Sequence, residues 1–372
     1  MSLFTKAAAF GLTACAMIAT AGLDPQGYEL IRDVNVPPNA GTIVWEANDP
    51  LTGAPIYRAL IEPVFIPEGT TLEIKPGCYI FGLSGGSEGD NSGTLCAAQG
   101  GKLIAEGTVD SPIVFTAVGD DPRLGKDMGP GVNNMWGGVI LLGNAPISNG
   151  ITDPAHPHYL EHPIEGLGDE DDRAWYGGDD PHDNSGSLKY VSIRHGGATE
   201  ASNEEINGLT LGGVGDATVL DFIEVYANSD DGFEFFGGTV GLKHAVAAYV
   251  GDDAFDYDEG WKGRGQYWYA IRHQVEGERG GEHDGLAPGN PLHLASEPTI
   301  YNVTYVGPHY WDYEGFDTKQ GVLFRDSAGG HYNNAIIAHF GGAPVENDPT
   351  GHDVWPRRQW GAANGLTFEY SI

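Results

Sequence analysis

The sequence has 372 residues, and 19 Lys and Arg stand against 52 Asp and Glu, for a formal net charge of −33 at pH 7. Nucleic acid and anionic membrane surfaces attract basic patches, so this balance excludes both as expected partners. The 57 Gly are too many for a helical protein and favour a fold with a tight turn every few residues.

The first 21 residues have the pattern of a signal peptide. Lys6 supplies a positive charge, Ala7–Ile18 is small and apolar, and Ala19–Ala21 has the Ala-x-Ala form of a cleavage site. The alternative is a lipoprotein signal, because Leu12–Cys15 resembles a lipobox that would place a lipid on Cys15. Both interpretations predict a secreted or cell-surface protein, and no later stretch is long and apolar enough to span a bilayer.

Residues 22–63 form an irregular lead-in, which we expect to cap the domain that follows. One strand is predicted in it, at Thr42–Trp45. From residue 64 to residue 372 short strands alternate with turns. The first clear example is Thr70–Gly77, where polar and apolar residues alternate before a Pro-Gly turn.

Two cysteines, Cys78 and Cys96, follow the predicted signal. They are 18 positions apart (96 − 78), which is close to one turn of the repeat described below. They would then lie on adjacent turns within reach of a disulfide. A secreted protein favours that bond, which would contribute about 3 kcal/mol in the chain-entropy model. A zinc pair is the alternative, although no neighbouring His or Cys completes such a site.

An acidic insert over residues 150–186 interrupts the strands. It contains Asp179, Asp180 and Asp183 in an oxygen-rich phrase that ends in Gly, which is typical of a cation loop but lacks the spacing of an EF-hand. We expect a Ca²⁺ site here, with a solvated loop as the alternative.

Residues 228–260 contain nearly the same phrase twice. Asp230–Phe235 returns as Asp252–Tyr257, and the offset is 22 residues (252 − 230) at every position. A fixed period in the twenties is typical of a solenoid, in which each repeat forms one turn stacked on its neighbour. Because β-branched, aromatic and Gly residues are abundant and no helical apolar stripe is present, the pattern favours a parallel β-helix.

The repeat predicts a ladder of carboxylates. Equivalent residues of successive turns of a β-helix lie about 4.8 Å apart. Because side chains alternate along a strand, Glu234 and Asp256 would share the face opposite the aromatic residues. Two carboxylates at that distance repel by about 3–4 kcal/mol at a surface-like dielectric, so several of them require protons or cations.

Ca²⁺ accepts many oxygen ligands in loose geometry. The residues expected to bind it are Asp230, Asp231, Glu234, Asp252, Asp253 and Asp256. Glu282 and Asp284 alternate in the same manner and are candidates for a third rung. The alternative is that these acids are solvated at turn corners, where Asp is common.

Aromatic residues follow the repeat. Trp261, Trp268 and Trp311 are candidates for a platform that stacks on sugar rings, with coverage of a core edge as the alternative. The sequence ends in the alternating stretch 366–372, a strand whose backbone groups could pair with another copy. Such head-to-tail contact would give a filament, and a shortened chain is the alternative.

Several phrases resemble a widespread group of bacterial secreted or surface proteins. The phrases are GGKLIAEGTVDSPIVFTA, WGGVILLGNAPI, DNSGSLKYVSIRHGG, NGLTLGGVGDATVLDFIEV and DDGFEFFGGTVGLKH. The similarity runs from about Thr70 to about Phe340. Members of the group are right-handed parallel β-helices, often labelled lipoproteins. The resemblance therefore implies an all-β, single-stranded, right-handed parallel β-helix over residues 64–372, and it implies no particular activity.

A weaker, local resemblance concerns the repeat itself. Asn228–Phe233 and Gly251–Ala254 are similar to the acidic motifs of polygalacturonases, which are β-helical inverting glycosidases. This resemblance implies that Asp253 protonates the leaving oxygen while Asp230 and Asp252 hold the attacking water. The chain departs from that family in having no Gly-His-Gly phrase and no Arg-Ile-Lys phrase. Its negative charge also opposes an anionic substrate unless a cation bridges the two.

The features above predict a non-catalytic, cation-stabilised structural or adhesive protein outside the cell. Its expected partners are other copies of the chain and glycans. Two alternatives are an inverting glycosidase and a Ca²⁺-dependent glycan-binding module.

Overall fold

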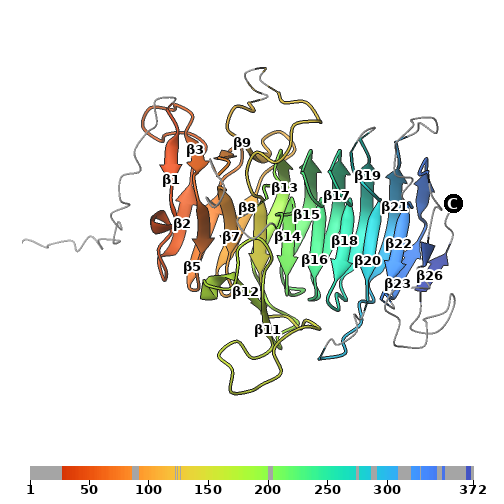
Figure 1. The fold of residues 1–372 in the computed structure, drawn as a ribbon. Coiled ribbons are helices and arrows are strands. Elements are labelled where there is room, and N and C mark those ends of the chain that lie inside the picture. The colour runs from red at the N-terminus through yellow and green to blue at the C-terminus, as the bar shows by residue number, and fades with distance from the viewer. Residues whose placement is uncertain are drawn as a thin grey trace, which may run out of the picture.

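The chain folds into a right-handed parallel β-helix, as predicted (Figure 1). The computed structural model describes residues 27–85, 92–121, 123, 125, 127–199, 204–273, 276–285, 291–308, 320–326, 328–341, 346–347 and 366–369. Within these ranges, two long parallel sheets run from one end of the molecule to the other. No helix in the same ranges has the length and apolar character needed to cross a bilayer.

The larger sheet contains fifteen of the described strands. They are β1 (Glu29–Ile31), β2 (Gly41–Trp45), β3 (Tyr57–Leu60), β5 (Thr70–Ile74), β6 (Tyr79–Gly82), β8 (Lys102–Glu106), β9 (Ile113–Ala117), β13 (Gly186–Arg194), β15 (Val219–Tyr226), β17 (Gly241–Ala248), β19 (Arg264–Ile271), β21 (Thr299–Val306), β23 (Gly330–Asn333), β24 (Ile336–Ala338) and β26 (Leu366–Glu369).

The smaller sheet contains nine strands among the described residues. They are β4 (Pro63–Ile66), β7 (Thr94–Ala97), β10 (Val139–Leu142), β14 (Leu209–Gly212), β16 (Phe233–Phe236), β18 (Phe255–Asp258), β20 (Gly281–Asp284), β22 (Val322–Arg325) and β25 (Glu346–Asn347). The remaining elements are an antiparallel hairpin of β11 (Glu161–Pro163) and β12 (Trp175–Gly177), and the short 3₁₀ helices η1 (Asp33–Asn35) and η3 (Asp172–Ala174).

The 22-residue repeat sets the register between turns. Strand β16 pairs in parallel with β18 so that Glu234 lies beside Asp256 and Phe235 beside Tyr257. On the larger sheet, β15 pairs with β17 at the same offset of 22, for example Leu220 with Leu242 (242 − 220). One repeat is therefore one turn of the helix, and equivalent residues are direct neighbours.

A residue in the left-handed conformation bends each long strand of the larger sheet. In β13, β15, β17 and β19 the bend occurs at the ring-bearing residues Tyr190, Phe222, His244 and Tyr267, whose φ angles are +49°, +55°, +50° and +59°, and in β21 it occurs at Asn302, with φ of +59°. The pairing of β13 with β15 skips this position, so each long strand has two halves that face different directions. The four side chains stack in a row at ring-centroid distances of 4.2–4.9 Å.

The interior of the stack is filled by aromatic and aliphatic side chains. Phe255 stacks on Trp268 at 4.4 Å and Phe235 on Trp261 at 4.1 Å between ring centroids. Trp261 and Trp268 are 0% and 1% exposed, and each indole N–H donates to a backbone carbonyl. The prediction that these two residues stack on sugars is therefore wrong: they are core residues. Trp311 lies outside the described residues.

The lead-in takes part in the sheets. Strand β2 covers the predicted strand and pairs in parallel with β5, while β1 and β3 pair with each other. Strand pairing thus begins before residue 64, because the first turn already contributes strands to the larger sheet.

The predicted disulfide is not formed. Cys78 and Cys96 are both free and buried. Cys78 precedes β6 of the larger sheet, and its thiol donates to the carbonyl of Trp45 at 3.3 Å. Cys96 lies in β7 of the smaller sheet, among the side chains on the outer face of that sheet. The spacing of 18 residues falls short of a whole turn, so it places the two thiols on different sides of the helix.

Candidate functional site

A row of carboxylates follows the outer face of the smaller sheet. Glu234, Asp256 and Glu282 lie in register on β16, β18 and β20, and we call these three residues the acidic ladder. They are half-buried, whereas the residues that alternate with them, such as Phe235 and Tyr257, point into the core. The third rung expected at Glu282 is thus present.

The turns that precede β16 and β18 contain four of the predicted aspartates. Asp231, which is 6% exposed, accepts the backbone N–H of Asp253 at 2.8 Å. Asp253, which is 1% exposed, accepts both the backbone N–H of Arg279 and its guanidinium group, the latter at 3.1 Å. These two carboxylates connect one turn of the helix to the next, and Asp253 is held by Arg279 on both of its oxygens.

The carboxylates of the turns and the ladder form three overlapping clusters. Within each cluster, one ligand atom from every residue lies within 4.8 Å of the others. The clusters are Asp230–Asp231–Asp252, Asp231–Glu234–Asp256 and Asp252–Asp253–Glu278. The structure therefore brings together all six ligands predicted from the repeat. It adds Glu278, which the sequence pattern missed because the next turn is four residues longer than the repeat.

Burial makes these carboxylates hard to ionise. Burial, with the nearby charge of Glu165, raises the pKa of Asp230 to about 8. Burial also raises the pKa values of Glu234 and Asp256 well above their usual range, and the neighbouring acids add to the effect. At the end of β18, burial and Asp284 raise the pKa of Asp258 to about 7. The row must bind protons or cations at neutral pH.

Basic residues neutralise only one end of the row. Arg279 contacts Glu278 at 2.9 Å and Glu282 at 3.0 Å, in addition to Asp253. Arg325 forms an ion pair with Asp284 at 2.6 Å. In the ranges that the structure describes, no Lys or Arg forms an ion pair with Asp230, Glu234 or Asp256.

The acidic insert supplies one further carboxylate to this face. The Asn207 amide donates to Glu165 Oε1 at 2.9 Å and also to Glu234, so it joins the insert to the ladder. Asn207 is 1% exposed, and its Oδ1 has no hydrogen-bond partner among the described residues. Neither Glu165 nor Asn207 could be predicted as a site residue from the sequence pattern, because neither belongs to the repeat.

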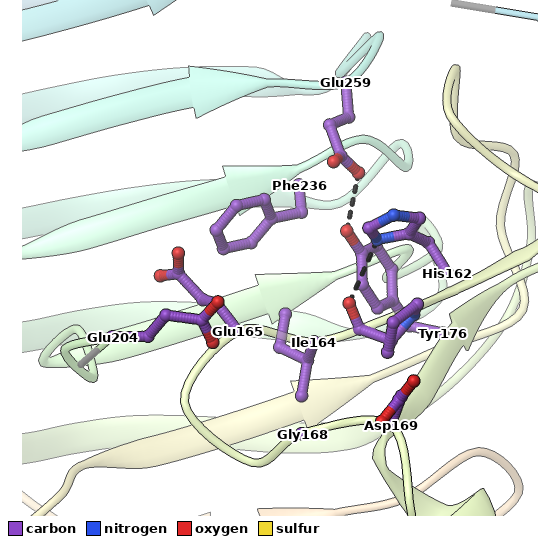
Figure 2. A pocket seen from close by; sticks show the side chains of 10 residues that line it. His162, Ile164, Glu165, Gly168, Asp169, Tyr176, Glu204, Phe236 and Glu259 are labelled. Carbon is purple, nitrogen blue, oxygen red and sulfur yellow. Dashed lines mark hydrogen bonds between the residues drawn. The ribbon is translucent and has the colours of Figure 1, made fainter. Parts of the chain in front are cut away.

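The hairpin of the insert lines one side of a half-open cavity of about 420 Å³ on the outer face of the smaller sheet. Its lining residues are His162, Pro163, Ile164, Glu165, Gly168, Asp169, Tyr176, Glu204, Phe236 and Glu259. Figure 2 shows the Tyr176 hydroxyl pointing to Glu259, to which it donates a hydrogen bond of 2.6 Å.

The second predicted cation site is not assembled. Asp179 and Asp180 are exposed, and Asp180 accepts the backbone N–H of His182 at 2.9 Å. Asp183 accepts hydrogen bonds from Asn144 and Ser185 instead. None of the carboxylate clusters found in the described part of the chain includes these three aspartates.

Comparison with known proteins places the fold in context. A family model described as a pectate-lyase-like β-helix domain matches residues 50–363. Among solved structures, the catalytic unit of a thermostable GH87 α-1,3-glucanase from Streptomyces thermodiastaticus aligns at 9% sequence identity with a TM-score of 0.23. The alignment covers 85% of this chain and 63% of the glucanase chain, and it is too distant to support an argument about function. The comparison with curated proteins gives no match.

Proposed function

Since the chain belongs to the family of pectate-lyase-like β-helix domains, we propose that it binds acidic polysaccharides outside the cell through Ca²⁺ held on its acidic face. The observation that carries this proposal is the pair of carboxylate clusters that Arg279 does not neutralise, Asp230–Asp231–Asp252 and Asp231–Glu234–Asp256. The binding is non-catalytic, in keeping with an adhesive or structural role.

The donor set fits Ca²⁺. All ligands in the clusters are carboxylate oxygens, which Ca²⁺ prefers. Two oxygens on opposite sides of one Ca²⁺ lie about 5 Å apart, since each bond is about 2.3–2.6 Å long, and the cluster atoms lie within 4.8 Å of one another. Asp256 Oδ1 is buried without a hydrogen-bond partner in the described residues, so it is free to coordinate.

Charge explains why a cation would be needed for binding. The chain carries a net charge of −33, and a polyuronate such as pectate is also anionic. The two would repel each other unless a divalent cation lay between them. Ca²⁺ on the half-buried ladder could keep part of its coordination shell for sugar carboxylates, because it accepts six to eight oxygen ligands.

The geometry disfavours the glycosidase alternative. An inverting enzyme would need Asp253 as a proton donor, but both oxygens of Asp253 are bonded to Arg279 in the interior. Arg279 also contacts Glu278 and Glu282, so it holds Asp253 within a network of ion pairs.

Binding to polygalacturonate, measured by co-sedimentation with and without chelator, tests the proposal. We expect binding in Ca²⁺ and none in EDTA. Asp256→Asn should weaken binding at least tenfold, whereas Asp110→Asn, at an exposed turn, should not change it. Unchanged binding in EDTA would contradict the proposal. Release of reducing ends in the same tubes would support the glycosidase alternative.

Head-to-tail assembly stays a prediction. If copies pair through their terminal strands, negative-stain microscopy of the secreted protein will show filaments rather than isolated rods.

A further inference from the structure

The cavity beneath the hairpin adjoins the proposed polysaccharide-binding surface, because Asn207 joins its lining residue Glu165 to Glu234 of the acidic ladder. Its volume of about 420 Å³ is within the range of small-molecule sites, about 300–1,000 Å³. Side chains from two parts of the chain line it (Figure 2). The insert contributes His162, Glu165 and Tyr176, and the turns of the helix contribute Phe236 and Glu259.

The polar lining consists of acidic groups and one histidine. Glu165, Asp169, Glu204 and Glu259 all line the cavity, and no Lys or Arg does so among the described residues. His162 Nδ1 lies 3.0 Å from the carbonyl oxygen of Pro163, to which it can donate. In that neutral tautomer Nε2 is an acceptor, so the lining offers many acceptors and few donors.

Glu259 is the most buried acid of the cavity, at 8% exposure. It accepts hydrogen bonds from the Tyr176 hydroxyl and the Asn149 amide, and both of these partners are uncharged. Burial raises the pKa of Glu259 well above its usual range. The carboxyl group of Glu259 is therefore buried without a positively charged partner among the described residues.

The rest of the lining is apolar. Ile164, Phe236 and the ring of Tyr176 form it, and Figure 2 shows Phe236 between Glu165 and Glu259. An aromatic face beside carboxylates favours a ligand with an apolar body and a positive, hydrogen-donating group. A cation compensates the ionised carboxylates, whereas a neutral ligand leaves these buried acids to bind protons instead.

We infer that this cavity binds a small organic ammonium ion, with the ammonium group at Glu259 and Glu165 and the body of the ligand against Phe236. The inference goes beyond the proposed polysaccharide binding. The two sites are joined through Asn207, but they use different carboxylates and take different ligands.

Isothermal titration with two ring compounds of matched shape tests the inference. The probes are cyclohexylamine, which is cationic at pH 7, and cyclohexanol, which is neutral, both in EDTA. We expect cyclohexylammonium to bind at least tenfold more tightly than cyclohexanol, and Glu259→Gln to remove that preference. Asp110→Asn, at an exposed turn, should leave it intact.

Equal affinity for the two probes in the wild-type protein would overturn the inference, and this measurement does not depend on a variant that folds. Competition between Ca²⁺ and cyclohexylammonium that disappears in Glu259→Gln would also overturn it, because the cavity would then be a metal site. Asp256→Asn separates the two proposals: it should weaken Ca²⁺-dependent polygalacturonate binding and leave cyclohexylammonium binding unchanged.

Discussion

Asp253 is almost fully buried, at 1% exposure, in the turn that precedes β18. Its carboxylate bonds to the backbone and the guanidinium of Arg279 in the next turn, in the interior of the molecule. The motif resemblance correctly placed Asp252 beside Asp253, but it did not indicate that Arg279 would pair with Asp253. Arg279 lies in the turn that is four residues longer than the repeat, so no residue of the 22-residue pattern corresponds to it.

Replacement of Asp253 by Ala should destabilise the protein strongly. The change removes one of the carboxylates that pair with the Arg279 guanidinium, and it removes the acceptor of the Arg279 backbone N–H. Removing one partner of a buried ion pair lowers the free energy of unfolding by about 3–5 kcal/mol. The free energy of unfolding in urea measures the effect. Asp110→Ala, at an exposed turn, should change it by less than about 0.5 kcal/mol. A similar small change at Asp253 would show that the bond to Arg279 is not needed for stability.

Replacement of Asp256 by Asn should have opposite effects with and without Ca²⁺. In EDTA at pH 8 the variant should melt at a higher temperature than the wild type, because it removes a buried carboxylate that ionises at the expense of stability. With Ca²⁺ at 100 times its Kd, the wild type should gain about 2.7 kcal/mol, and the variant should lose most of that gain. Differential scanning calorimetry measures both. An equal Ca²⁺ response in the two proteins would exclude Asp256 as a ligand.

At the scale of the strand, the repeat explains why the ladder could be predicted. A parallel pair places equivalent residues side by side, so an exact period fixes which carboxylates meet, as Glu234 and Asp256 do. The period does not indicate which residues of the insert lie against the smaller sheet, so it could not predict that Glu165 would be near Glu234. It also does not separate interior from exterior aromatic residues, so for Trp261 and Trp268 both a sugar-stacking platform and coverage of a core edge stayed open. Their burial depends on the packing of several turns.

The stacked strands predict a pH dependence. The folded pKa values of Asp230 and Asp258, about 8 and about 7, lie above the unfolded value of about 3.9. The folded protein therefore binds more protons than the unfolded chain between these values, and the contribution of both groups to stability falls as the pH rises from about 4 to about 8.

Melting temperatures between pH 4 and pH 8 in EDTA measure this dependence. We expect a decline toward pH 8, and Ca²⁺ should reduce the slope because it compensates the ionised row. In Asp230→Asn the decline should be smaller. A melting temperature that rises through this interval in EDTA would contradict the assignment of these buried groups.

At the scale of the whole molecule, the fold class followed directly from the sequence. The 22-residue period and the absence of helical patterning predicted the β-helix, and the two long parallel sheets confirm it. The two cysteines could not be placed in the same manner. Their spacing gave a separation along the chain, whereas a disulfide depends on which side of the turn each residue occupies.

A duplicated turn should fold and bind more Ca²⁺. Inserting a second copy of residues 233–254 after residue 254 would add one short strand, one long strand and a further pair of aspartates in register. Because the turns pair in a constant register, the added one repeats the strand pairing of the original. The number of Ca²⁺ ions bound per chain, measured by isothermal titration calorimetry, should rise. An unchanged number would contradict the prediction that each turn adds ligands.

The common register of core and ladder has a consequence for evolution. A gene segment of one period adds interior packing and surface ligands in the same step, so the reach of the protein along a polymer can grow without any redesign of the scaffold. Avidity for a long chain of sugar acids would then rise with the number of copies, even if the affinity at each rung stayed constant.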